Sequence, residues 1–490
     1  MSNYKHGIRT SRKATQLSIP ITSEGCLQCV IGTAPVNLAA NPYETVNKPF
    51  VVHNMTAAKE AVGYSTDFKK YTLCQSMYAT FEVFGVAPLI MINVLDPTKH
   101  VKAQLSKEYT VHGGKTHVDE TGILLDKLSV ATTDGTTEYK VDEDYVASFN
   151  SDGTLSIAII KTGAAKDAKE IKVTFIQLDP SAVTYEDIIG AYNTQTRKRT
   201  GMELIGMVYP KYELVPSLLL APGWSHIPTV NLALNAKAEL ISSMFSAKVI
   251  SDLDSSKGKA DSVENVKEYK DNNAYSDRKT IVAWPLVGVD DYIYYFSAQL
   301  AASMQYLAAC NGGVPSKTPS NKELKINGIY LDDGSEVLLD QGEANDYLNA
   351  CGVVGAINVK GWRSWGNNTA AYPSSSDPID RWINIATIFD YIENNFKLTF
   401  FQNVDDLTNY RLIDEVVSGF NIQLNSLQGS DNIAGGEIVF EHDENPINNI
   451  MAGKIKFHTK IGGYTPAEDI ENVFEFDPTI TQAALKGGEE

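Results

Sequence analysis

The sequence predicts a multidomain protein of mixed α+β and α/β class, with a central α/β core, an inserted all-β domain and a C-terminal α+β domain with extended terminal arms. The length of 490 residues fits roughly three domains. Strand-like and helix-like patterns alternate on both sides of a turn-rich stretch near residues 104–180. The first segment of the chain is basic and the last is acidic, which suits pairing between molecules.

The composition is that of an acidic globular protein, with 43% hydrophobic and 21% charged residues. Asp and Glu number 60 against 42 Lys and Arg, and the net charge of -18 disfavours a general role in nucleic-acid binding. The N-terminus lacks the apolar region of a secretory signal, and the longest apolar stretch, 86–95, is too short to span a bilayer. The five cysteines imply no disulfide framework. We therefore expect a protein made in a reducing cytoplasm, without membrane insertion.

Residues 1–17 are expected to form an extended arm, because they show no apolar periodicity. The α/β core is assigned to residues 18–103 and 186–370, where alternating strands and helices favour a largely parallel sheet. The patterns in the core predict helices over 68–84, 230–245 and 297–310, and strands over 89–95 and 281–284.

Residues 104–185 interrupt the core and are expected to form a β-rich outer domain. Short runs such as 157–160 and 171–176 are separated by turn signals, among them Asp134-Gly135. Because this texture is inserted between two α/β segments, we interpret it as a peripheral decoration of the core.

The C-terminal domain is assigned to residues 371–465. Helices are predicted over 381–396 and 408–427, followed by a strand over 454–461. Residues 466–490 are predicted to form a C-terminal arm, in which Phe474 and Phe476 alternate with acidic residues in a strand pattern.

Motifs for catalysis or ligand binding are weak. Gly113-Gly114-Lys115-Thr116 resembles part of a phosphate loop, but Tyr109 stands where that motif needs glycine, so a surface turn is favoured. Cys26 and Cys29 form a C-x-x-C pair without a second ligand pair, and half-buried strand thiols are favoured over a zinc or redox site.

The histidines show no tight metal-binding spacing either. His112 and His117, with Asp119 and Glu120 nearby, could bind a metal, but an ordinary surface group is favoured. Neither a nucleophile elbow nor a dinucleotide fingerprint occurs. We therefore expect no catalytic, cofactor-binding or metal-binding residues.

Four blocks of the chain, in order, resemble motifs of one protein family. Tyr4-Lys5-His6-Gly7-Ile8 is similar to Y-x-H-G-V, residues 31–34 to an early strand-and-turn motif, and residues 47–54 to N-K-P-x-x-I-x-N. Residues 361–369, the most specific block, resemble G-x-R-x-W-G-N-R-T through Gly361, Arg363, Trp365, Gly366 and Asn367. The family is the tail sheath proteins of contractile phage tails and R-type bacteriocins. Asn368 stands here in place of the usual Arg.

This resemblance implies a structural, non-enzymatic subunit without a cofactor. Such a subunit polymerises as stacked hexameric rings around an inner tail tube and contracts to drive the tube through a target cell envelope. The implied partners are other copies of the chain, the tube protein, the baseplate and the tail terminator. The implied location is a virion tail or bacteriocin particle, assembled in the cytoplasm of a bacterial host. A subtilisin-like hydrolase and a surface-layer or adhesion protein are the alternatives; the absence of an assignable triad and of a signal peptide disfavours them.

Two sets of residues are predicted to contact other chains. The first would join neighbouring subunits through strand addition by the arms: Tyr4, Gly7, Ile8, Arg9, Arg12, Lys454, Lys456, Glu471, Phe474, Glu475 and Phe476. The second would face the tube from one of the two C-terminal helices, between which the sequence does not decide: Asp390 and Glu393, or Arg411 and Asp414.

Overall fold

An eight-stranded sheet lies at the centre of the described chain, in the order β23-β22-β17-β16-β15-β2-β5-β3. The computed structural model describes residues 21, 22 and 24–485. The middle strands are parallel, and the two edge strands β3 and β23 are antiparallel to their neighbours. The strands are β2 Gln28–Gly32, β3 Pro49–Val52, β5 Leu89–Asn93, β15 Leu218–Leu220, β16 Lys248–Asp252, β17 Thr280–Ala283, β22 Val353–Asn358 and β23 Trp362–Trp365.

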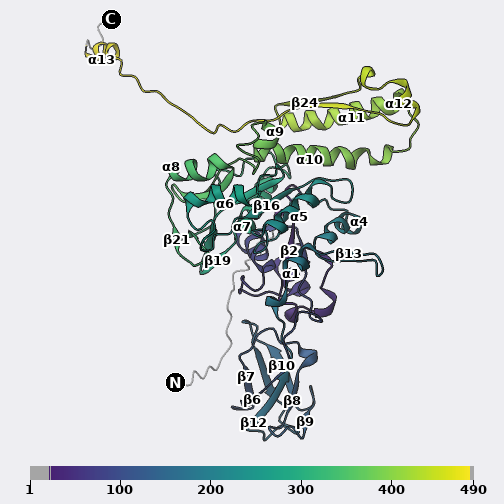
Figure 1. Ribbon diagram of the computed structural model, residues 1–490, viewed down its shortest axis with the longest axis vertical. Helices are drawn as coiled ribbons and strands as arrows, with labels where there is room; N and C mark the ends of the chain where they lie inside the picture. Colours follow the sequence, from purple (N-terminus) through teal and green to yellow (C-terminus); the bar gives the residue numbers. More distant parts are fainter. Residues whose placement is uncertain (1–20, 23, 486–490) are drawn as a thin grey trace, which may run out of the picture.

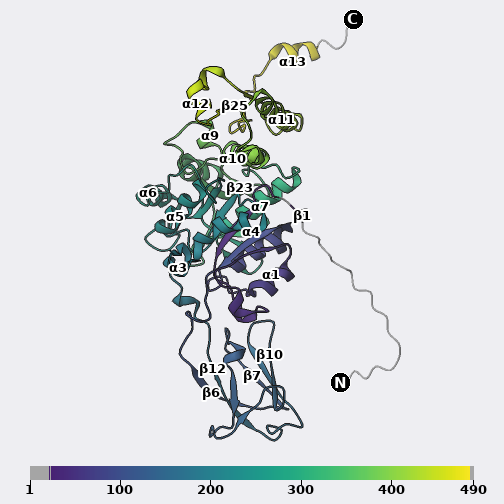
Figure 2. The same cartoon turned by 90° about the vertical axis from the view of Figure 1, so that its right-hand side faces the viewer.

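The sheet is covered on both faces, because every residue of β2, β5, β16 and β17 is buried. Helices flank it on both sides (Figure 2). They are α1 Met55–Val62, α2 Leu73–Met77, α3 Tyr185–Ile189, α4 Val208–Tyr212, α5 Pro228–Glu239, α6 Val266–Asn272, α7 Phe296–Cys310 and α8 Gln341–Glu343. The predicted parallel sheet, the strands near 89–95 and 281–284 and the helix near 297–310 are confirmed.

Shorter strands extend the core at its margins. One small sheet has the order β19-β18-β20-β21, and two further strand pairs are β1 with β4 and β13 with β14. Their bounds are β1 Ile21–Thr22, β4 Val86–Ala87, β13 Tyr192–Asn193, β14 Lys198–Arg199, β18 Leu286–Val289, β19 Tyr292–Tyr294, β20 Gly328–Tyr330 and β21 Glu336–Val337.

The helix predicted over 68–84 begins later than expected and changes type. Helix α2 continues as a π-helix, Tyr78–Phe84, which ends at Gly85 with a φ of 63°. The preceding residues are held in an irregular conformation because Thr33 Oγ1 accepts from Thr72 N at 3.0 Å and donates to Lys70 O at 2.8 Å.

The helix predicted over 230–245 ends early, at Glu239 of α5. Ser242 and Ser243 both have positive φ, and Ile241 bridges to Phe245. These residues therefore form a tight turn before β16 and do not continue the helix.

The segment between β5 and α3 contains two small sheets that share one core at the far end of the molecule from the C-terminal domain (Figure 1). The strands are β6 Leu105–Thr110, β7 Lys115–Val118, β8 Ser129–Ala131, β9 Glu138–Tyr139, β10 Tyr145–Phe149, β11 Leu155–Ile159 and β12 Glu170–Phe175. This β module meets the core at a narrow neck, where Val101 bridges to Leu178 and Lys102 N donates to Gln177 O at 2.9 Å.

The C-terminal domain packs on the opposite end of the core (Figure 1). Its elements are α9 Pro378–Arg381, α10 Ile383–Phe400, α11 Tyr410–Gly429, β24 Gly435–Val439, α12 Ile447–Met451 and β25 His458–Gly462. Both predicted helices are confirmed, because Ile388, Ile392, Val416, Phe420 and Leu424 are spaced to form one apolar seam between α10 and α11.

After β25 the chain leaves the body and ends the described part in α13, Pro478–Leu485 (Figures 1 and 2). The strand predicted around Phe474 and Phe476 is wrong for the single chain, because this stretch pairs with no strand among the described residues. The predicted mixed, multidomain fold class is confirmed. Within the described residues, no helix has both the length and the apolar character needed to cross a membrane.

Candidate assembly interface

The motif segment 361–369 joins the core to the C-terminal domain. It begins in edge strand β23 and runs beside the chain that enters α10. Ile383 N donates to Asn367 O at 2.9 Å, and Thr369 N donates to Arg381 O at 2.7 Å. These backbone bonds attach the start of α10 directly to the segment that leaves the central sheet.

Side chains of the motif reinforce this junction. Asn367 is buried, and its Nδ2 donates to Asn384 Oδ1 in α10 at 2.8 Å. Trp365 Nε1 donates to Asn345 Oδ1 at 2.7 Å. Gly366 has a φ of 127°, and a Cβ there would also lie 2.6 Å from a neighbouring side-chain oxygen, so the position requires glycine.

The other two motif residues lie at the outer start of β23. Gly361 forms the turn before the strand with a φ of 105°. Arg363 donates through Nη1 to Asn321 O at 3.2 Å and bridges to Glu323 through its backbone. Their contacts stabilise the edge strand from which the junction begins.

Arg381 connects the junction to the base of the C-terminal segment. Its Nε donates to Oδ1 of Asn368, the motif position that departs from the family pattern, at 2.9 Å. Its guanidinium lies 4.4 Å from the ring centre of Tyr372 and 3.8 Å from that of Trp382. Nη2 donates to Glu468 Oε2 at 2.6 Å. One side chain thus ties the motif, α10 and the departing chain together.

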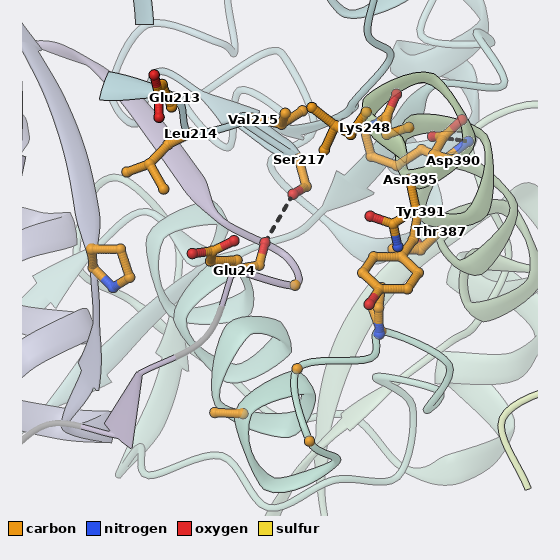
Figure 3. A pocket seen from close by; sticks show the side chains of 18 of the residues that line it. Glu24, Glu213, Leu214, Val215, Ser217, Lys248, Thr387, Asp390, Tyr391 and Asn395 are labelled. Carbon is orange, nitrogen blue, oxygen red and sulfur yellow. Dashed lines mark hydrogen bonds and ion pairs between the residues drawn. The ribbon is translucent and has the colours of Figure 1, made fainter. Parts of the chain in front are cut away.

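Asp390 is buried between α10 and the core, so its prediction as a tube-facing residue is wrong. Its Oδ1 lies 2.8 Å from Lys279 Nζ. Its Oδ2 lies 3.2 Å from Lys248 Nζ, and Figure 3 shows Asp390 and Lys248 side by side. Burial opposes ionisation of Asp390, but the two ammonium groups outweigh it and lower the pKa of the carboxyl. Burial also lowers the pKa of Lys248, against the attraction of Asp390. The cluster joins β16 and β17 to α10.

The same face of α10 makes a second buried contact. Asn394 Oδ1 accepts from Ser246 N at 3.1 Å, and Asn394 Nδ2 donates to Ser246 O at 2.8 Å. A cleft of 610 Å³ lies beside these contacts, and Figure 3 shows Glu24, Ser217, Tyr391 and other side chains around it. The residues that line the cleft belong to both domains, so it marks the seam between them.

Glu393, on the next turn of α10, is exposed and forms a loose pair with Lys397 at 4.0 Å. Helix α11 is more open to solvent, because it packs on α10 and β24 through one face only. Arg411 and Asp414 lie on its exposed side. Of the two helices, α11 therefore offers the larger free surface.

Strands β24 and β25 pair with each other and, among the described residues, with no third strand. Each has an outer edge that can accept another strand. The strand predicted over 454–461 begins later, at His458, because Asn445 holds the preceding chain: Lys456 N donates to Asn445 Oδ1 at 2.7 Å. Lys454 and Lys456 therefore lie just before β25, and both are exposed.

The C-terminal segment 463–485 is held only at its base. Asn384 Nδ2 donates to Tyr464 O at 3.1 Å, and Glu468 pairs with Arg381. Beyond this point the side chains are exposed, and those of Phe474 and Phe476 are 90% and 80% exposed. Glu471 and Glu475 lie on this same free stretch. Large aromatic rings left in water indicate a surface that is buried in an assembly.

The remaining predicted arm residues, Tyr4, Gly7, Ile8, Arg9 and Arg12, lie outside the described residues.

The weak chemical motifs have structural explanations. Gly113 and Gly114 form the turn between β6 and β7, as predicted. Cys29 lies in β2 and Cys26 just before it; both are fully buried and not half-buried as predicted. Burial raises the pKa of each thiol to about 12. Both thiols are thus protonated at neutral pH and poorly suited to metal binding or redox exchange.

Serine, histidine and aspartate side chains do meet at the carboxyl end of β16. Asp252 is buried and accepts hydrogen bonds from Ser297 N at 2.8 Å and from Ser225 Oγ at 3.3 Å. His226 stacks on Tyr295, and its Nδ1 has no hydrogen-bond partner among the described residues. No histidine activates either serine here, so this cluster is not arranged as a hydrolytic triad.

One group of three possible metal ligands occurs in the described chain. Glu441, Glu444 and His458 offer atoms within 4.8 Å of one another. Lys456 pairs with Glu444 at 3.1 Å and lowers the pKa of that carboxyl, which makes the group an ion-pair cluster. His117 pairs with Asp119 at 3.1 Å on the surface of the β module.

A comparison with curated proteins finds a relative that matches the chain over nearly its full length. The tail sheath protein of Burkholderia phage BcepMu is 25% identical over 503 residues, which cover 99% of both chains. The chain is a homologue of tail sheath proteins. No protein-family model matches the sequence.

Solved structures of contractile injection systems share the fold of this tail sheath homologue. A chain of the anti-feeding prophage baseplate has a TM-score of 0.58 and 14% identity, over 97% of this chain and all of that one. A chain of the sheath complex of the extracellular contractile injection system PVC, in the contracted state, has a TM-score of 0.56 and 13% identity, over 98% and 100%. The likeness extends through all the domains, including the C-terminal one.

Proposed function

We propose that this chain is the structural subunit of a contractile tail sheath. Copies polymerise as stacked hexameric rings around an inner tail tube, and contraction of the stack drives the tube through the envelope of a target cell. Homology to a phage tail sheath protein over the full chain supports this function. The shared fold with a sheath complex in the contracted state supports it further.

One observation carries the proposal: the C-terminal segment leaves its own body with exposed aromatic rings, while the outer edges of β24 and β25 pair with no other described strand. A strand pattern without a partner in its own chain fits the edge of a second copy. The acidic residues Glu471 and Glu475 complement Lys454 and Lys456 beside β25. Backbone bonds supply the joining energy, because exposed ion pairs contribute only about 0–1 kcal/mol each.

The N-terminal arm serves the same purpose from the other end of the chain. Fully extended, residues 1–16 span roughly 50 Å, enough to reach a neighbouring body. Arg9 and Arg12 pair with the acidic C-terminal segment of another copy, and the charges set register and partner choice.

Contact with the tube is made by the exposed face of α11, through Arg411 and Asp414. The burial of α10 between the core and α11 supports this assignment. The ends of the sheath meet the baseplate and the tail terminator, in a virion tail or bacteriocin particle assembled in the bacterial cytoplasm. The subunit is not an enzyme, because contraction releases energy stored in alternative packings of the copies.

Electron microscopy of the chain co-expressed with its tube protein tests the function. We expect striated sheaths around tubes from the full chain. Variants lacking residues 1–16 or 466–490 are expected to remain folded by circular dichroism but to stay monomeric. A truncated chain that still forms contractile sheath contradicts the exchange of arms, and a full chain that forms flat lattices contradicts the sheath function itself.

A further inference from the structure

The C-terminal domain exposes large apolar side chains at the end away from the departing C-terminal segment. They come from the turn between α10 and α11 and from α12, and Figure 1 shows these two segments at the same end of the domain. We call this surface the apolar end; it consists of Phe401, Val404, Leu407, Tyr410, Ile447 and Met451. Leu407 is 83% and Met451 is 81% exposed. Such a gathering on one surface indicates a binding site.

Helix α13 is the other unpartnered apolar element of the described chain. Ile480 and Leu485 are both exposed, and Figure 1 shows α13 on the opposite side of the C-terminal domain from α12. An isolated helix of this length is marginal in water, so it needs a surface to pack on. The two apolar surfaces therefore cannot cover each other within one compact body.

Strand direction brings α13 of one copy to the apolar end of another. Strand β25 begins near α12 and runs toward the point where the C-terminal segment leaves the body. If residues 471–477 of a second copy pair antiparallel with β25, they run back toward the start of β25. Their continuation, α13, then arrives at the apolar end. Parallel pairing would place α13 at the opposite end, beside the core.

Charge and reach favour a second copy as the occupant. Lys454, Lys456 and Lys460 are exposed along and just before β25, and Glu471, Glu475 and Asp477 precede α13. Lys456 and Lys460 also pair with Glu444 and Glu441 of their own chain, at 3.1 Å and 3.9 Å, so Lys454 is the lysine of this set without an ion pair among the described residues. Residues 463–477 span about 50 Å when extended, so the segment can reach across a neighbouring domain. We propose that α13 of one copy docks on the apolar end of a second copy and fixes the antiparallel direction of the exchanged strand. This inference rests on the proposed sheath function.

Substitutions on each surface test the docking. Two double variants are compared: Ile480→Asp with Leu485→Asp, and separately Leu407→Asp with Met451→Asp. We expect each double variant to raise the protein concentration needed for sheath assembly by about tenfold or more, because each natural residue buries a large apolar side chain on docking. Leu232→Asp is the matched control, because Leu232 is an exposed leucine on α5 of the core. All these positions are exposed in the single chain, so the variants are expected to fold. Unchanged assembly of both double variants overturns the proposal.

Cysteine cross-linking identifies the occupant. In a Cys310→Ser background, which removes the exposed thiol, Ile480→Cys with Met451→Cys is expected to give disulfide-linked ladders of copies in assembled sheath. Ile480→Cys with Leu232→Cys is expected to give none. A cross-link to the tube protein, or no ladder in intact sheath, overturns the docking.

A chain ending at residue 477 separates this inference from the proposed function. It keeps the exchanged strand but lacks α13, so we expect weak assembly that yields short sheaths. If it assembles like the full chain while a chain ending at residue 465 does not, strand exchange stands and the docking of α13 is wrong. If the chain ending at 465 also assembles, the exchange of C-terminal arms fails as well.

Discussion

Lys279 Nζ lies 2.8 Å from Asp390 Oδ1, and this buried ion pair joins the residue just before strand β17 of the core to helix α10 of the C-terminal domain. The two residues are far apart in sequence and come from different domains. A second lysine, Lys248, contacts the other oxygen of the same carboxylate at 3.2 Å. Two buried cations thus depend on one anion, which makes Asp390 the member of the cluster whose loss costs most.

Replacing Asp390 by alanine is expected to lower the free energy of unfolding by about 3–5 kcal/mol, because two buried ammonium groups lose their partner. Urea unfolding followed by circular dichroism measures the change. Glu393→Ala is the matched control on the same helix, and we expect it to alter stability by less than about 1 kcal/mol because its pair with Lys397 is exposed. Equal stability of the two variants would show that the cluster does not hold the domains together.

The buried Asp252 makes stability depend on pH. Burial raises its pKa from 3.8 to about 6 in the folded protein, even though Ser297 and Ser225 donate to the carboxylate. The carboxyl of Asp252 therefore holds its proton more tightly in the folded state than in the unfolded state. Its contribution to the free energy of unfolding is fully present below pH 3.8 and is lost as the pH rises through 6.

Comparison with Asp252→Asn isolates this effect from other titrating groups. Between about pH 4.5 and pH 7.5, the free energy of unfolding of the natural chain is expected to fall by roughly 2 kcal/mol relative to the Asn variant. Thermal or urea unfolding at both pH values checks it. If the free energies of unfolding of the natural chain and the Asn variant differ by the same amount at both pH values, the pKa of Asp252 is not raised.

Removal of the β module is expected to leave assembly intact. The two chains at its neck are already paired, since Val101 bridges to Leu178, so a short Gly/Ser bridge in place of residues 103–176 spans the gap without strain. Most buried apolar residues of the module form a core of their own, whereas Leu124 is buried in the core of the body. Negative-stain microscopy of the deletion variant with tube protein is the measurement. A folded deletion variant that fails to polymerise would mean that the module lies at a contact between subunits.

Charge reversal on α11 is expected to weaken decoration of the tube. Arg411→Glu combined with Asp414→Lys changes two exposed positions on the face that the domain leaves open. We expect binding to purified tube, measured by co-sedimentation, to fall about three- to tenfold, as two exposed charge contacts contribute roughly 0–1 kcal/mol each. Lys140→Glu, an exposed change on the β module, is the control. If the α11 variant binds tube like the control, the tube contact lies elsewhere.

The sequence predicted those parts of the fold that depend on local pattern. Buried runs such as residues 89–93 indicated the parallel strands, and the apolar stripe of α11 predicted its helix. The role of Asp390 was missed because its lysine partners lie more than a hundred residues away in the sequence. In addition, an acidic residue on a helix is normally expected to face solvent. The strand predicted at Phe474 has no partner strand among the described residues, so its pattern alone could not place it in the fold.

The role of the motif at 361–369 also depends on contacts that a local sequence pattern does not reveal. The sequence identified its residues through resemblance, but not their role, because Asn367 and Thr369 bond to residues at the start of α10. Only the folded chain places them at the junction of two domains. The short spacing between the motif and the predicted helix could have indicated this role, because it leaves the two domains little freedom to separate.

The junction has a mechanical consequence. A short connection that is hydrogen-bonded along its backbone and supported by a buried ion cluster has low compliance, so the core and the C-terminal domain turn as one lever. In the proposed sheath, a load that the C-terminal domain applies to the tube would reach the core with little elastic loss. The softer elements of such a sheath would be the thin segments between one lever and the next.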